Sequence, residues 1–201
     1  MKIISTILIS AAVFFTLNHI IPTNEEFEIY QNTVRLHVLA NSDSENDQNA
    51  KLKVRDALLE KISSYDSDSK EDALDMIEQK KDELCRVAEG ILKNEGMSHS
   101  VRIEIGKEHY PTRYYDDFAL PAGNYTSVRV IIGEGEGQNW WCVLYPPLCT
   151  ASAIKYDEDY CIEAGLTKGQ YNLITDNHRG EYKIKFRLLE IASEVFGFQY
   201  D

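Results

Sequence analysis

The chain opens with an uncharged apolar run, residues 3–21, and no other apolar run in the sequence is as long. At ~1.5 Å per residue a helix of this length measures roughly 28 Å, which is close to the thickness of a hydrocarbon core. Lys2 precedes the run and three glutamates follow it within a few residues, so the positive-inside rule places the rest of the chain outside the cytoplasm. We therefore interpret 1–22 as a signal or anchor segment, 23–33 as a linker and 34–201 as a single exported domain.

Cleavage of the run after export would need small residues at alternating positions before the cut. The stretch "TLNHIIPT" at 16–23 has no such pattern, and Ser10, Ala11 and Ala12 lie too early in the run. The sequence thus favours an uncleaved anchor over a cleaved signal peptide, and both interpretations stay open.

Composition limits the partners of the exported part. The chain has 21 Lys+Arg against 33 Asp+Glu, a net charge of -12. Such a charge repels a phosphate backbone, so nucleic acid is not expected as a partner. Export permits disulfides, yet the four cysteines form no C-x-x-C pair, which argues against a zinc ribbon or a thioredoxin-type redox site. No cofactor is expected.

Hydrophobic periodicity predicts an α+β fold. Period-2 alternation indicates strands, and apolar residues that return every three or four positions indicate amphipathic helices. The predicted strands lie near 34–40, 101–105 and 125–132, and the predicted helices near 47–65, 70–94 and 183–196. This order favours a mostly antiparallel sheet packed with about three helices.

The segment "NWWCVLYPPLC" at 139–149 holds both tryptophans of the chain and two of its four cysteines. After the glycine-rich loop 133–138 it is predicted to be the second strand of a β-hairpin, ended by two prolines that cannot donate to a ladder. Alternation divides its side chains into two apolar sets: Trp140, Cys142 and Leu144 on one face, and Trp141, Val143 and Tyr145 on the other. Either both faces are buried, or one remains available to a partner.

Several short motifs contain residue types that can bind a metal ion or act in catalysis. "DSEND" at 43–47 lacks the glycine and glutamate of a calcium loop, so a turn and a helix cap are predicted there. His37 is expected to be a partly buried histidine bonded to a neighbour rather than a ligand or base. Cys142 lies in the middle of a strand, which disfavours a nucleophile. A disulfide from Cys142 to Cys149 is a further hypothesis, because the turn made by the prolines could bring the two together.

Three longer blocks of the sequence belong together: "VRLHVLANSDSENDQNAKLKVRDALL" at 34–59, "YPTRYYDDFALPAGNYTSVRVIIGEGEGQNWWCVLYPPLC" at 110–149 and "YKIKFRLLEI" at 182–191. All three resemble one family, stage II sporulation protein R of endospore-forming bacteria. The resemblance implies an intercellular signal that is exported across the forespore membrane into the intermembrane space. There it would be secreted, or anchored by residues 3–21. It would activate a membrane-embedded aspartic protease that processes pro-sigma E in the mother cell, and would not itself be an enzyme.

We expect aromatic side chains to make the contact with that protease, because aromatic residues often dominate binding energy. The candidates for contact are Trp140, Trp141, Tyr145, Tyr114, Tyr115, Phe118 and His37. The alternative function is an exported thiol- or metal-dependent hydrolase acting on peptide or cell wall, which would use Cys142 or His37.

Overall fold

The computed structural model describes residues 4, 6, 10, 24–65, 67, 69–115, 118–148 and 158–175. Within these residues no helix has the length and apolar character that a membrane crossing requires. The predicted span at 3–21 is described only at residues 4, 6 and 10, so it stays a prediction. The predicted helix at 183–196 lies outside the described residues.

The chain divides into two compact units. The main unit comprises Gln31–Glu108 and Tyr125–Thr167, and the second unit comprises Met1–Tyr30, His109–Asn124 and Lys168–Asp201.

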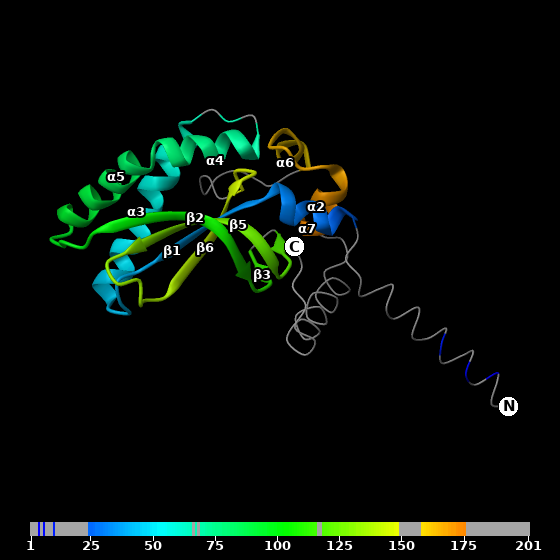
Figure 1. Cartoon of the computed structure of the whole chain (residues 1–201), viewed down its shortest axis with the longest axis horizontal. Coiled ribbons are helices and arrows are strands. Elements are labelled where there is room, and N and C mark those ends of the chain that lie inside the picture. The colour runs from blue at the N-terminus through cyan, green and yellow to red at the C-terminus, as the bar shows by residue number, and fades with distance from the viewer. Residues whose placement is uncertain are drawn as a thin grey trace. The chain divides into compact units, whose positions relative to one another are not determined.

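A four-stranded sheet with the strand order β2-β5-β1-β6 dominates the main unit. The helices α3, α4 and α5 lie on one side of this sheet (Figure 1). The strands are β1 (Val34–Leu39), β2 (Val101–Tyr110), β5 (Gly123–Ile132) and β6 (Asn139–Tyr145). The helices are α3 (Glu45–Ser63), α4 (Lys70–Gln79), α5 (Lys81–Asn94) and, after the sheet, α6 (Glu158–Glu163). The α+β class is confirmed.

The pairing of β1 corrects two predictions. β1 runs parallel to β5, with Leu36 beside Val128, and antiparallel to β6, with Leu36 beside Cys142. The sheet is therefore mixed, with a parallel pair that the prediction of a mostly antiparallel sheet did not include, and β5 and β6 do not form a hairpin. Parallel pairing requires a long crossover, which the three helices and β2 supply. The glycine loop 133–138 can pass over β1, because six residues reach farther than the roughly 10 Å between strands separated by one strand.

The apolar core lies between the sheet and the three helices. Alternate residues of β1 point into it, and so do the helical stripes predicted from the sequence. Its fully buried members include Val34, Leu36, Val38, Val54, Leu58, Leu84, Ala88 and Leu92.

Two helix boundaries have clear local causes. Ser44 caps α3, its Oγ accepting the N–H of Asp47 at 3.2 Å, as expected for the predicted turn and cap. The single helix predicted at 70–94 is wrong, because α4 ends and α5 begins at Lys80, whose φ of -97° and ψ of 6° leave the helical region. Neither glycine nor proline marks this break, so the sequence did not reveal it.

The second unit contains α2 (Asn24–Asn32), α7 (Lys168–Thr175) and a two-stranded ribbon of β3 (Arg113–Tyr114) and β4 (Ala119–Leu120). Helix α2 occupies the stretch expected to be a linker. Its Tyr30 is buried, and the hydroxyl donates to the carbonyl of Ala122 at 3.1 Å. Gly123 is needed beside it, because a Cβ there would lie 2.5 Å from the Tyr30 ring.

Candidate functional site

His37 lies at the centre of a partly buried polar cluster on the sheet face that points away from the core. Its ring Nδ1 is 2.9 Å from Glu108 Oε1, and its Nε2 is 2.8 Å from Asn139 Oδ1. The residue is only 5% exposed, and the Trp141 ring lies 5.4 Å away. Both ring nitrogens thus face oxygen atoms of neighbouring side chains. Neither nitrogen is left to act as a base towards a substrate.

Glu108 extends this cluster across the sheet. Ser127 Oγ donates to its Oε2 at 2.7 Å, and Arg129 Nε lies 3.8 Å from its Oε1. Arg129 also reaches Glu104 at 3.3 Å. The cluster therefore joins side chains from β6, β1, β5 and β2, and its chemistry is that of a bonded network rather than an open catalytic site.

The two tryptophans occupy opposite faces of β6, as alternation predicted. Trp140 packs against the core on the helix side, where the guanidinium carbon of Arg55 lies 4.6 Å from its ring centroid. Trp141 is half-buried on the other face beside His37. A single partner surface therefore cannot cover both rings from one side of the strand.

Tyr145 does not lie on the predicted face. The register shifts so that Val34 faces Tyr145 while Arg35 faces Val143, which leaves Leu144 as the extra residue of a β-bulge. The bulge reverses the alternation, so Tyr145 packs against the core cluster together with Leu144. No residue pattern in the sequence indicates this bulge.

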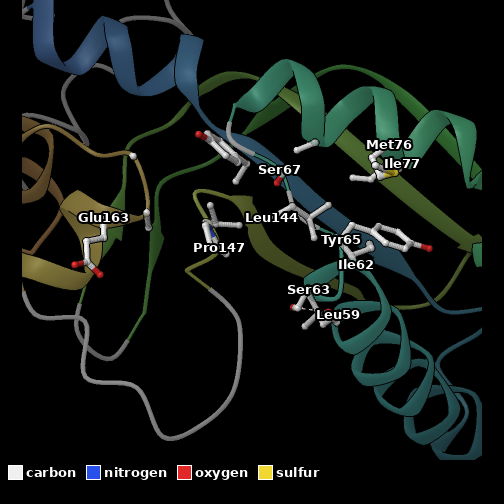
Figure 2. A pocket seen from close by; sticks show the side chains of 15 residues that line it. Leu59, Ile62, Ser63, Tyr65, Ser67, Met76, Ile77, Leu144, Pro147 and Glu163 are labelled. Atoms are coloured by element: carbon white, nitrogen blue, oxygen red, sulfur yellow. Dashed lines mark hydrogen bonds between the residues drawn. The ribbon is translucent and has the colours of Figure 1, made fainter.

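A pocket of about 450 Å³ opens next to Tyr145. It lies between the end of α3, helix α4, the end of β6 and the turn after α6 (Figure 2). Its described lining residues are Leu59, Ile62, Ser63, Tyr65, Ser67, Ala73, Met76, Ile77, Val143, Leu144, Tyr145, Pro147, Glu163, Ala164 and Gly165. No sequence pattern pointed to this pocket, because four separate segments form it.

The remaining aromatic candidates belong to the second unit. Tyr114 on β3 is 53% exposed. The Tyr115 and Phe118 rings stack with their centroids 4.4 Å apart, and Phe118 is buried. Of these three, Tyr114 has the most surface to offer a partner.

Cys142 is buried and disulfide-bonded, whereas Cys85 and Cys161 are not joined in disulfides. Cys149 lies outside the described residues, so its pairing with Cys142 stays a prediction. A sulfur held in a disulfide cannot serve as a thiolate nucleophile, and alternation puts it on the face opposite His37. The structure thus contradicts a Cys142–His37 hydrolase. Among the described residues, no group of three or more His, Cys, Asp or Glu could hold a metal ion.

The turn 41–48 is organised around the buried carboxylate of Asp47. Asn41 Nδ2 donates to Oδ2 at 2.9 Å and Ser42 Oγ at 2.5 Å, while His99 Nε2 lies 3.2 Å from Oδ1. The hydrogen bond from Ser42 has the largest effect, and together these donors hold the pKa of Asp47 below its ordinary value. The acidic stretch suggestive of a calcium loop is therefore a hydrogen-bonded turn.

The glycine loop 133–138 fits against this turn. Gln138 N–H donates to Asp43 Oδ1 at 2.8 Å, and Gly137 N–H to the Ala40 carbonyl at 2.9 Å. The buried Lys51 donates to the Gln138 carbonyl at 2.8 Å, and its burial lowers the pKa of the ammonium group. Two of the blocks quoted above thus interlock at the end of β1.

We expect Asp47→Asn to destabilise the main unit by about 1–2 kcal/mol at pH 7, because bonds to an ionised group are lost. The lowered folded-state pKa means that this stability exists above the ordinary pKa near 4 and disappears as pH falls through the folded-state value. Urea unfolding should therefore show the variant and the wild type converging in acid. Asp72→Asn is the matched control, since Asp72 is exposed and also follows a capping serine, Ser69, by three residues. An equal loss in both variants would contradict the role of the turn.

Fold and geometry together define an acidic α+β protein whose most distinctive residues are bonded to each other rather than arranged around a reactive group. The family model described as stage II sporulation protein R matches residues 30–155. The stage II sporulation protein R of Bacillus subtilis (strain 168) is 33% identical over 191 residues, covering 86% of this chain and 85% of that protein. No solved structure matches the chain. The chain belongs to the stage II sporulation protein R family, which makes it a sporulation signalling protein.

Sequence reasoning missed Glu108 and Asn139, the two partners of His37. Asn139 borders the tryptophan segment, and Glu108 lies near the end of a strand with several charged residues, so each looked like a solvated residue. Only the strand order, which places β2 and β6 on either side of the β1–β5 pair, could have brought them to His37.

Proposed function

We propose that the chain is an exported signal that activates a membrane-embedded aspartic protease, so that pro-sigma E is processed in the mother cell. The observation that carries this proposal is the family match over residues 30–155. The bonded His37 cluster and the disulfide-bonded Cys142 support contact rather than catalysis. Binding would favour the active state of the protease through a higher affinity for that state.

We also propose the place of action. The apolar run 3–21 with Lys2 before it would direct the remainder of the chain across the forespore membrane into the intermembrane space. The main unit and the second unit would then meet the protease on the outer side of the mother-cell membrane. An anchored and a cleaved form would both satisfy this topology.

Reconstitution in a heterologous bacterial host tests the proposal. Cells that make the protease, pro-sigma E and the full chain should accumulate the shortened sigma factor, and cells without the chain should not. A variant lacking residues 3–21 is the topology control and should be inactive, because it would remain in the cytoplasm. If all three proteins are present in their expected compartments and no processing occurs, the proposed function is wrong.

A further inference from the structure

We propose that the pocket beside Tyr145 is the docking site for an amphipathic segment of the partner, one that presents apolar side chains with a lysine or arginine next to them. This inference rests on the proposed function, because it assigns the surface through which the signal would contact its protease. It places the contact on the helix side of the sheet, away from Trp141 and His37.

The walls of the pocket suit apolar side chains. Leu59 and Ile62 come from the last turns of α3, Met76 and Ile77 from α4, and Leu144 from β6. Figure 2 shows these side chains gathered around one opening. Sites of roughly 300–1,000 Å³ with mostly apolar walls and a few polar groups are typical of ligand-binding pockets.

The wall formed by the turn after α6 is fixed to the end of β6. Tyr160 Oη donates to the Pro147 carbonyl at 2.9 Å. Gly165 has a φ of +106°, and a Cβ there would lie 3.1 Å from Tyr145 Oη, so the turn closely approaches the Tyr145 ring. The Leu166 N–H closes the helix end on the Cys161 carbonyl at 3.0 Å. The pocket is therefore formed before a partner arrives, which reduces the entropic cost of binding.

The negative charge of Glu163 favours a partner segment that carries a basic residue. Of the described residues that line the pocket, Glu163 alone is charged, and it lies across the pocket from Met76 and Ile77 (Figure 2). Its carboxylate has no hydrogen bond or ion pair with the described residues, whereas nearby Glu83 is already paired with Lys61 at 2.7 Å. An exposed, unpaired carboxylate at the edge of apolar walls is complementary to a lysine or arginine, and the net charge of -12 strengthens that preference.

The volume of the pocket indicates that more than one side chain of the partner enters it. The volume of about 450 Å³ is roughly three times the ~150 Å³ of a cavity that holds benzene. Two or three apolar side chains on one face of a short helix would fill it, as in other helix-in-groove contacts. A lipid chain or a neutral apolar molecule would not require the carboxylate, and the test separates these cases.

Two matched pairs of variants in the full chain test the pocket in the reconstituted system. Ser63→Trp fills its mouth, and Ser64→Trp places the same ring on the neighbouring exposed residue that does not line it. Glu163→Lys reverses the charge at the pocket, and Asp159→Lys reverses an exposed charge elsewhere on α6. With the signal protein limiting, Ser63→Trp and Glu163→Lys should each lower sigma-factor processing about tenfold or more, as expected for a central contact. The two controls should stay within about twofold of wild type.

Binding of each full-chain variant to the detergent-solubilised protease, at low and high salt, gives a second readout. Wild-type affinity should fall with salt, because the carboxylate contacts a cation. Thermal unfolding of each pair confirms that the variants fold alike. Normal activity of Ser63→Trp, with wild type active, would overturn the pocket inference and leave the proposed function intact. If Ser63→Trp lowers processing and Glu163→Lys does not, the partner has no lysine or arginine at this site. If the wild-type chain itself triggers no processing, the proposed function is wrong and this inference falls with it.

Discussion

Replacing Gly137 with alanine is expected to destabilise the main unit by about 2–3 kcal/mol. A Cβ at this position would lie 2.3 Å from the backbone oxygen of Ser42 and 2.9 Å from the Cβ of Ala40. Neither neighbour is free to move, because the Ser42 oxygen accepts a bond from Gln48 Nε2 at 2.8 Å and Gly137 N–H is bonded to Ala40. The glycine loop would therefore have to leave the turn and expose Lys51.

Gly90→Ala is the control for that experiment. Gly90 lies inside α5, and an added Cβ would meet nothing within 4 Å. Alanine should therefore stabilise this helix by up to about 1 kcal/mol. Urea unfolding measures the free energy of unfolding of both variants. A change in the same direction at both glycines would contradict the close packing of the glycine loop against the turn 41–48.

Glu108→Ala should cost about 2 kcal/mol, the second large effect. The substitution removes the carboxylate that His37 Nδ1 and Ser127 Oγ contact, so two hydrogen bonds to largely buried side chains are lost. The expected cost is below the roughly 3–5 kcal/mol of a fully buried pair, because the Glu108 side chain is 23% exposed.

Glu104 provides a matched comparison on the same strand. It lies four residues earlier on the same face of β2 and contacts Arg102 and Arg129 at 3.5 and 3.3 Å, but its side chain is 48% exposed. Glu104→Ala should therefore change stability by no more than about 0.5 kcal/mol. Equal losses at 104 and 108 would mean that the His37 cluster adds nothing beyond a surface ion pair.

Local signals were sufficient for most individual elements. The alternation at 34–40 and 125–132 and the stripe through Val54 and Leu58 correspond to β1, β5 and α3. The pairing of β1 was not accessible in this way, because a loop of six residues can either turn back in a hairpin or pass over one strand. That choice depends on the burial of β1 between two partners, which is a property of the whole sheet.

The sequence indicated several residues of the candidate site, but not how they are arranged in space. His37 and the two tryptophans were identified, and the opposite faces of Trp140 and Trp141 followed from alternation. Tyr145 was misplaced because one extra residue in β6 reverses every side chain after it. The pocket and Glu163 were missed because no short stretch of sequence contains more than one of its walls.

The position of β1 also determines when the sheet can form. Its Leu36 pairs with Val128 on one side and Cys142 on the other, so both neighbours are made about a hundred residues later. A chain that emerges N-terminus first must hold β1 without a sheet partner until β5, which follows about 90 residues later, has also emerged. Such long-range pairing makes folding slow. The order of strands would thus delay completion of the sheet, which suits the export proposed above, because an incompletely folded chain can be threaded through a translocation channel.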